Sequence, residues 1–319
     1  MTDPLVAVVV LNYNGHEDTR ACICSLQQAS YPRLLIIVVD NASPKPGLET
    51  ALQGLPSVEI VRASSNLGFA RGNNLGIRHA LALGADYVTL LNNDTIVERN
   101  CFEPLIAAAE SRPRVGAVAG TVLAYTDAPT DKIWYAGGKV SKLRGGESRA
   151  LLGQRFRIED FPNVIETKYV TGCFMMLPRF IIETCGALDE DFFFGVEDLE
   201  LSWRLQKRGF RILYVPGSVI WHRGGRTRPY SGAAVYRLYV SKVLLMRKML
   251  PVACFPCWQF LHRLYMGVWG ARRSEHYLIS HGYPALVPGS YRSVVLRALR
   301  DAGAGGLDTY SVPFDLRNT

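Results

Sequence analysis

The chain has 319 residues, of which 48% are hydrophobic and 20% are charged. This length can bury a sizeable core in one or two domains, and the composition excludes both a disordered chain and a small scaffold held together by disulfides. The formal net charge of +8 combines −6 over residues 1–203 with +14 over residues 204–319, a split that suits an anionic partner for the C-terminal part, either a nucleic acid or a membrane surface.

Two buried strands joined by a helix are predicted at the start of the chain. Residues 6–11 and 34–39 are apolar, β-branched runs of strand length, and such uninterrupted hydrophobicity indicates burial on both faces of a parallel sheet. Residues 16–29 between them place apolar side chains at helical spacing, among them Ile23 and Leu26. The pattern therefore predicts a βαβ unit.

The same alternation continues through residue 123. Further strands are predicted at residues 57–62, 87–91 and 115–123, and helices at 70–83 and 102–111. Polar segments begin where three of the strands end, at residues 12, 40 and 92. In an open α/β sheet the loops that leave the carboxyl ends of the strands form the ligand crevice, so these polar segments are expected to line a binding site.

The second half of this region is less regular. The periodicity weakens from residue 125 to residue 164, which predicts an irregular excursion able to host an acceptor-side loop. A strand is predicted at 169–177 and a helix at 179–185, and a further helix opens near Glu197 and ends at Gly209. The last strand segments are predicted over residues 211–215 and 219–221, closing at Trp221-His222.

The polar segments do not carry the glycine-rich signatures of dinucleotide oxidoreductases or phosphate-binding ATPases. They are Asn12-Tyr13-Asn14-Gly15, Asp40-Asn41-Ala42-Ser43, the stretch from Asn66 to Asn74, and Asn92-Asn93-Asp94. In this order they resemble the family-2 glycosyltransferases with the GT-A fold, particularly the rhamnosyltransferase-like members that build bacterial surface polysaccharides. The resemblance covers about residues 5–225.

The resemblance implies an α/β GT-A fold, with a mostly parallel central sheet flanked by helices. It divides the chain into a nucleotide-sugar-binding half at residues 1–124 and an acceptor-binding and catalytic half at residues 125–230. The remaining residues, 231–319, form a basic, aromatic extension whose composition predicts helices.

A nucleotide-sugar donor is expected at the polar segments. The residues implied are Leu11, Asn12, Asn14, Asp40, Asn41, Asn66, Gly68, Arg71, Asn74, Asn92, Asn93 and Asp94. Asp40 can accept a hydrogen bond from the imide N–H of uracil or thymine, and Arg71 supplies a charge for phosphate oxygens at the start of a helix. Asn and Asp also favour the turns that follow strands, which is the purely structural alternative.

A divalent cation, Mg²⁺ or Mn²⁺, is implied next to the donor. Asn92-Asn93-Asp94 stands where the family has its Asp-x-Asp metal motif, but here only Asp94 is a carboxylate. His222 falls where many relatives place a histidine near the same ion, although a histidine beside Trp221 can equally have a packing role. The cation would neutralise the departing diphosphate.

Glu197-Asp198 is the expected catalytic pair. Displacing a nucleoside diphosphate from an anomeric carbon with inversion requires one base facing the acceptor hydroxyl, and Asp198 is the first choice. Acids in the first turn of a helix are also favoured by the helix dipole without any chemistry. Residues 189–191 are predicted to be loop and acceptor-side surface.

The basic extension suits a helix lying in an anionic membrane surface, because Trp258 and Trp269 alternate with basic residues such as Arg272 and Arg273. A helical hairpin packed on the catalytic domain, or on a second subunit of a homo-oligomer, is the alternative. No nucleic-acid-binding module accompanies the charge, so nucleic acid is not an expected partner. No apolar run reaches about 18 residues and the first residues lack a basic signal segment, so we expect a cytoplasmic protein peripheral to the inner face of the membrane.

These observations predict an inverting, non-processive glycosyltransferase. Its donor would be a pyrimidine nucleotide-sugar such as dTDP-L-rhamnose, and its acceptor a hydroxyl of a growing, lipid-linked glycan. Processive relatives carry a Gln-x-x-Arg-Trp signature that is absent here. Two alternatives remain: a sugar-nucleotide synthase, whose glycine-rich N-terminal signature is missing, and a catalytically silent homologue that binds glycan or scaffolds an assembly, which the Asn-Asn-Asp departure favours.

Overall fold

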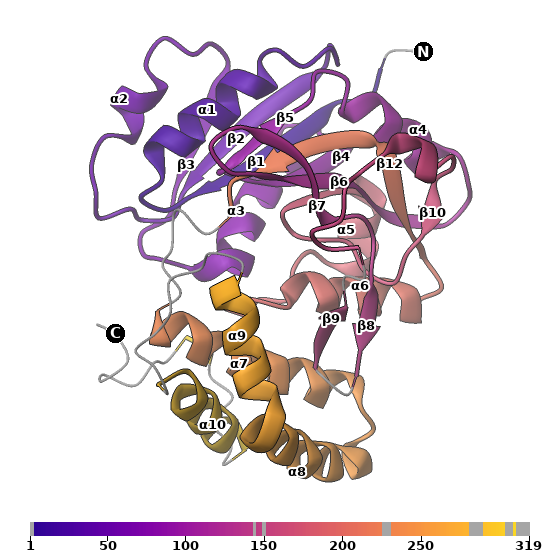
Figure 1. Ribbon diagram of the computed structural model, residues 1–319. Coiled ribbons are helices and arrows are strands. Elements are labelled where there is room, and N and C mark those ends of the chain that lie inside the picture. Colours follow the sequence, from indigo (N-terminus) through magenta and orange to yellow (C-terminus); the bar gives the residue numbers. More distant parts are fainter. Residues whose placement is uncertain are drawn as a thin grey trace.

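The computed structural model describes residues 3–142, 145–148, 151–224, 231–280, 290–303 and 309–310. Within these ranges the chain forms a central sheet flanked by helices, with a bundle of C-terminal helices below it (Figure 1). The predicted boundary at residue 230 lies outside the described residues. The predicted α/β fold with a mostly parallel sheet and a helical extension is confirmed.

Ten of the described strands form the central sheet. They are β1 (Val6–Asn12), β2 (Leu34–Asp40), β3 (Val58–Arg62), β4 (Tyr87–Asn92), β5 (Thr95–Val97), β6 (Val115–Tyr125), β7 (Pro129–Tyr135), β10 (Ile165–Glu166), β11 (Phe174–Pro178) and β12 (Arg211–His222). Their order is β10-β12-β6-β11-β4-β1-β2-β3, with β5 beside β12 and β7 beside β6. β11 runs antiparallel to its neighbours β4 and β6, whereas β1 to β4 pair in parallel. β8 (Lys139–Ser141) and β9 (Gly146–Ser148) form a separate pair.

The centre of the sheet is buried on both faces, as the apolar runs predict. Val8 lies between Ile36 of β2 and Thr89 of β4, and none of its surface is exposed. Burying a side chain of this size contributes roughly 1.5–3 kcal/mol. A continuous row of such residues therefore favours the middle of a parallel sheet over an edge.

Helices cover this sheet. They are α1 (His16–Leu26), α2 (Leu48–Leu52), α3 (Gly68–Ala82), α4 (Phe102–Glu110), α5 (Arg179–Cys185), α6 (Glu197–Lys207) and the 3-10 turn η1 (Ile158–Asp160). α3 packs on β1 and β2. Gly76 makes this approach close, because a Cβ there would lie 2.4 Å from Cγ1 of Val9.

One strand differs in extent from the predictions, and another joins two predicted segments. β11 begins at Phe174 and not at residue 169, because the N–H groups of Val170 and Gly172 bind the side chains of Ser202 and Asp198 on α6 and so cannot pair with a neighbouring strand. β12 continues past Val215, through an irregularity in its pairing with β6, as far as His222. β5 and β7, for which the sequence predicts no strand, complete the sheet.

The register brings the predicted polar segments to one edge. Asn12 pairs with Asp40 across β1 and β2, and Asn92 pairs with Leu11 across β4 and β1. The extension of β12 pairs His222 with Thr95 of β5. The ends of four strands therefore meet, as expected for a ligand crevice in this class of sheet.

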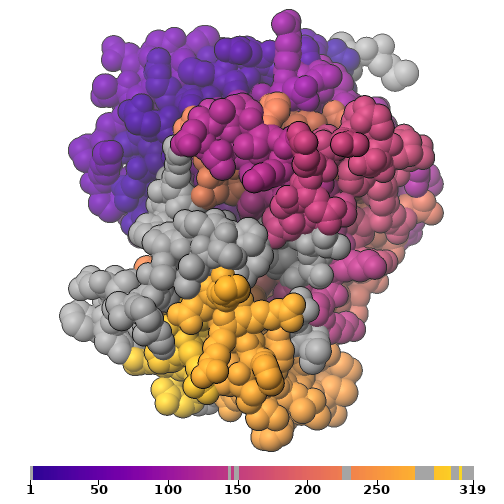
Figure 2. Space-filling view, in the orientation of Figure 1, coloured from indigo at the N-terminus to yellow at the C-terminus, as the bar shows by residue number. Residues whose placement is uncertain are grey.

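The C-terminal extension consists of α7 (Gly232–Met249), η2 (Val252–Cys254), α8 (Phe255–Tyr265), η3 (Met266–Gly270), α9 (Ala271–Ser280) and α10 (Ser290–Gly303). It forms the lower end of the molecule (Figure 2). Leu245 of α7 joins the main core, while Tyr239 of the same helix joins a second core with α10. None of the described helices is both long enough and apolar enough to cross a membrane.

Candidate functional site

Asp40 ends β2 within a network of polar contacts. Asn12 Nδ2 donates to Asp40 Oδ1 at 3.3 Å and to Ser43 Oγ at 3.1 Å. Ser43 Oγ donates to the same Asp40 oxygen at 2.6 Å, and the Asn14 N–H donates to Ser43 Oγ at 2.9 Å. Asn12 is fully buried and Asp40 is half-buried. Asn12 therefore orients the carboxylate from inside, while Asp40, like Asn14 and Ser43, is partly exposed.

The loop at Asn66 is held against the end of β2 by Asn41. Asn41 Nδ2 donates to Asn66 Oδ1 at 3.1 Å and to the Gly68 carbonyl at 3.0 Å, while its Oδ1 accepts from the Leu67 N–H at 2.9 Å. Gly68 has a φ of +74°, and a Cβ there would lie 2.4 Å from the Phe193 carbonyl oxygen. Only glycine suits this position, because the backbone is left-handed and closely approached.

Arg71 and Asn74 of α3 both contact Glu190. Arg71 Nε donates to the Glu190 carbonyl at 3.1 Å, and Asn74 Nδ2 donates to Glu190 Oε1 at 3.0 Å and to the Leu188 carbonyl at 2.8 Å. Asn74 is buried, whereas the Arg71 side chain is 42% exposed. Of the two, Arg71 is the one that can meet a ligand.

Leu11 and Asn93 support the site from inside. The Leu11 side chain packs on α3, where a Cβ on Gly72 would lie 2.7 Å from Leu11 Cδ1. Asn93 is buried and donates to the Gly15 carbonyl at 3.2 Å and to Thr19 Oγ1 at 3.0 Å. The side chains of Leu11 and Asn93 therefore contact other parts of the protein.

Asp94 and His222 form a buried pair. His222 Nε2 lies 3.0 Å from Asp94 Oδ1 and 3.4 Å from Asn92 Nδ2, and Trp134 packs edge-on against the imidazole. Burial acts to raise the pKa of Asp94 and to lower that of His222, but it is outweighed by the attraction between the two groups together with Arg223 near Asp94 and Cys173 near His222. The pKa of Asp94 is therefore lowered and the pKa of His222 is raised well above its usual value.

Glu197 and Asp198 begin α6 in different environments. Asp198 is half-buried, and its Oδ2 accepts from the Gly172 N–H at 3.0 Å while its Oδ1 accepts from the Leu199 N–H at 2.8 Å. Glu197 is buried, and this burial together with the adjacent Asp198 charge raises its pKa. Glu197 is accordingly held in its neutral form near pH 7.

The short segment Gly172-Cys173 connects α6 to the end of β4. Gly172 binds the Asp198 carboxylate through its N–H, and the next residue, Cys173, accepts the Asn92 N–H at 3.0 Å through its carbonyl. Asp198 and the end of β4 therefore lie on two sides of the same turn. The structure brings together Asp40, Arg71, Asp94, His222 and Asp198 around the carboxyl edge of the sheet.

Glu190 is a contributor to this region that the sequence does not indicate. Besides Arg71 and Asn74, it accepts from Arg78 Nη1 at 3.2 Å. The sequence predicts an acceptor-side surface loop at residues 189–191. No local pattern identifies Glu190 within it, because its partners are more than 110 residues away along the chain.

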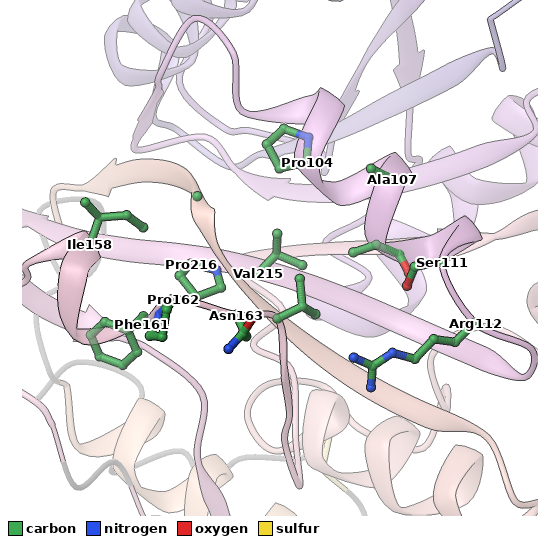
Figure 3. Close-up of a pocket in the computed structure, with 13 residues that line it drawn as sticks. Pro104, Ala107, Ser111, Arg112, Ile158, Phe161, Pro162, Asn163, Val215 and Pro216 are labelled. Atoms are coloured by element: carbon green, nitrogen blue, oxygen red, sulfur yellow. The ribbon is translucent and has the colours of Figure 1, made fainter.

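A surface cavity of about 590 Å³ lies elsewhere. It is formed by α4, the segment around Phe161 and the irregular part of β12 near Pro216, and the labelled side chains in Figure 3 surround it. None of the candidate site residues described in this subsection lines it. The cavity is therefore separate from the candidate site.

The comparison with known protein families decides the class of the protein. The family model described as glycosyl transferase family 2 matches residues 7–186, more than half of the chain. The chain belongs to glycosyl transferase family 2. This family 2 enzyme is a glycosyltransferase that takes its sugar from a nucleotide-sugar.

Curated relatives of this family 2 enzyme are distant. It is similar to the N-acetylglucosaminyl-diphospho-decaprenol L-rhamnosyltransferase of Mycobacterium tuberculosis (strain ATCC 25618 / H37Rv), with 24% identity over 242 residues that cover 70% of this chain and 76% of the relative. It is also similar to the poly-beta-1,6-N-acetyl-D-glucosamine synthase of Staphylococcus aureus (strain COL), with 26% identity over 211 residues, 66% of this chain and 47% of the synthase. The chain thus matches about half the length of the synthase.

Solved structures agree on the GT-A fold. The mannosyltransferase PcManGT from Pyrobaculum calidifontis, in complex with GDP-Man and Mn²⁺, superposes with a TM-score of 0.57 at 17% identity and covers 98% of this chain and 89% of that chain. GalNAc-T7 with UDP, GalNAc and Mn²⁺ has the same TM-score and identity, covering 88% and 58%. At this identity the likeness concerns the fold alone.

Proposed function

We propose that this family 2 enzyme transfers one sugar per encounter, with inversion, from dTDP-L-rhamnose to a hydroxyl of a growing, lipid-linked bacterial surface polysaccharide. The observation that carries the proposal is the carboxylate of Asp198, half-buried and held by two backbone N–H groups beside the strand end that leads to Asp94. The likeness to a mycobacterial L-rhamnosyltransferase, whose name specifies a diphospho-decaprenol acceptor, supports the choice of sugar and acceptor.

The donor binds, in this proposal, over residues 1–124, while residues 125–230 form the acceptor-binding and catalytic half and residues 231–319 the helical extension. Asp40 accepts the imide N–H of the pyrimidine, since Asn12 and Ser43 occupy Oδ1 and no donor from the described residues contacts Oδ2. Arg71 contacts the diphosphate through its guanidinium group. The buried amides of Asn41, Asn74 and Asn93 hold the loops in place.

Asp94 and His222 would hold Mg²⁺ or Mn²⁺. An ionised carboxylate and an imidazole whose nearest atoms are 3.0 Å apart fit such an ion if the ion displaces the proton that His222 Nε2 holds toward Asp94, and Asn92 adds a neutral amide beside them. Cys173 also hydrogen-bonds His222, but no group of three His, Cys, Asp or Glu side chains among the described residues could hold a metal ion, so phosphate oxygens and water would supply the other ligands. When bound, the cation neutralises the charge of the departing diphosphate.

Asp198 acts as the general base. It accepts the proton of the acceptor hydroxyl while the acceptor oxygen forms its bond to the anomeric carbon, and the bond from that carbon to the diphosphate oxygen breaks with its electrons leaving on the nucleoside diphosphate. A single displacement of this kind inverts the anomeric centre. The raised pKa of Glu197 keeps its carboxyl group neutral near pH 7, and this limits the negative charge next to Asp198.

The extension would bring the enzyme to the anionic inner surface of the cytoplasmic membrane. Five large apolar side chains of α8 and η3 form an exposed apolar ridge: Phe260 (68% exposed), Leu261 (49%), Leu264 (56%), Val268 (49%) and Trp269 (72%). Arg272 and Arg273 at the start of α9 are exposed beside it. We favour a lipid surface over a second copy, because two such basic faces would repel each other.

The first experiment is a thermal-shift panel with dTDP, UDP, GDP and their sugar conjugates, each with and without Mn²⁺. A nucleotide at a hundred times its Kd stabilises the folded state by about 2.7 kcal/mol, which is a readily measured shift. We expect stabilisation by dTDP or UDP species that requires Mn²⁺, and loss of this Mn²⁺-dependent stabilisation in Asp94→Ala. The matched control Asp131→Asn, whose exposed carboxylate pairs with Arg155, should respond as the wild type does. No response of the wild type to any nucleotide would contradict the proposal and favour the catalytically silent glycan-binding homologue.

A further inference from the structure

The far C-terminal part of the chain returns to the donor loops. Thr309 is 1% exposed, and its Oγ1 accepts from the Phe193 N–H at 2.8 Å and donates to the Asp191 carbonyl. Tyr310 donates through its hydroxyl to the Glu190 carbonyl at 3.0 Å. These residues follow α10 in the chain, yet their partners belong to the loop that precedes the catalytic helix α6.

Tyr310 also contacts Arg71. The guanidinium carbon lies 4.0 Å from the centroid of the Tyr310 ring, and that ring packs at 90° against Phe193 with 5.1 Å between centroids. The Tyr310 hydroxyl lies 3.4 Å from the carbonyl of Leu67, in the loop that precedes Arg71. A cation over an aromatic face is held by the ring quadrupole, so the ring restricts where the guanidinium can lie.

Two contacts restrain the guanidinium group of Arg71, one at its face and one at its Nε atom. Its Nε donates to the Glu190 carbonyl, and Tyr310 covers the plane of the group. The two terminal nitrogens make no hydrogen bond to any of the described residues, and the side chain is 42% exposed. Paired terminal N–H groups on a planar, immobilised guanidinium match the oxygens of a phosphate.

We propose that Tyr310 is a positioning residue of the donor site, which holds Arg71 in place for the diphosphate of the donor. The inference rests on the proposed function, because it assumes a nucleoside diphosphate as the ligand of Arg71. An arginine held in one place loses less conformational freedom when it binds, so the contact strengthens binding of the donor without touching the reacting atoms. The C-terminal end thus completes a site built mainly from the first half of the chain.

The test measures the Kd of dTDP in the presence of Mn²⁺ for the wild-type protein, for four single variants and for one double variant. We expect Tyr310→Ala to raise the Kd about ten-fold, a change typical of losing a cation–π contact and the order it imposes. Tyr310→Phe keeps the ring and should stay within about three-fold of the wild type. Phe180→Ala, which removes an exposed aromatic ring from α5, should leave the Kd unchanged.

The decisive arm is a double-mutant cycle with Arg71→Ala. If Tyr310 acts through Arg71, adding Tyr310→Ala to Arg71→Ala changes the Kd no further, although each single change weakens binding. Three outcomes overturn this inference but not the proposed function. Tyr310→Ala could have the same effect in both backgrounds, or it could leave the Kd unchanged. It could also lower the Kd, which would mean that the segment blocks the site. Absence of dTDP and UDP binding by the wild type overturns the proposed function with it.

Discussion

Replacing Asp198 by Asn separates a catalytic role from a structural one. Each carboxylate oxygen accepts one backbone N–H, from Gly172 at 3.0 Å and from Leu199 at 2.8 Å. An Asn side chain keeps one acceptor and turns its NH₂ group toward the other donor, so the folded state should lose about 1–2 kcal/mol. Loss of a general base lowers turnover about 10²–10⁴-fold, which corresponds to roughly 3–5 kcal/mol in the transition state.

The assay is the release of nucleoside diphosphate at saturating donor, with Tm recorded for each variant. We expect Asp198→Asn to fold, to bind donor and to turn over at least a hundred times more slowly. Asp131→Asn, on an exposed carboxylate paired with Arg155, is the matched control and should resemble the wild type. More than a tenth of wild-type turnover in a folded Asp198→Asn protein, or a hundred-fold loss in Glu197→Gln alone, would refute the assignment of the base.

Three further outcomes are expected. The folded-state pKa of Glu197 is raised, so its ionisation opposes folding as pH rises from about 5 toward 8. The stability of Glu197→Gln, measured by urea unfolding, should therefore increase relative to the wild type across that range. A difference in stability that stays constant with pH would contradict a neutral buried Glu197. Gly68→Ala and Gly84→Ala both force a residue into left-handed backbone, at a cost of about 1 kcal/mol. Only Gly68→Ala also meets a backbone oxygen, so it alone should weaken donor binding in titrations, and equal donor affinities would count against the loop assignment. Leu264→Ser on the apolar ridge should reduce co-sedimentation with anionic vesicles, whereas Phe180→Ser on α5, a similarly exposed apolar residue, should not; equal behaviour of the two variants would argue against the ridge as the lipid contact.

The sequence by itself determined the elements that depend on local pattern. The apolar runs that become β1, β2 and β4 are visible because a strand buried on both faces needs apolar residues at every position. The same reasoning places Asp40 and Asn92 at strand ends, and the order of the polar motifs indicates the family. β5 escaped prediction because its pairing is set by the distant strand β12. β7 pairs with its neighbour β6 in a hairpin, but its mixed polar and apolar sequence, Pro129-Thr130-Asp131-Lys132-Ile133-Trp134-Tyr135, does not indicate a buried strand.

Only the tertiary structure decided which of the predicted residues are buried with internal partners and which are exposed. Asn12, Asn74 and Asn93 look equivalent to Asp40 and Arg71 in the sequence, yet their amides are buried and satisfied by other loops. The return of Tyr310 to Arg71 likewise has no local signal. Hydrophobic periodicity is a property of neighbouring residues, whereas hydrogen bonds between loops depend on which strand ends the folded sheet brings together.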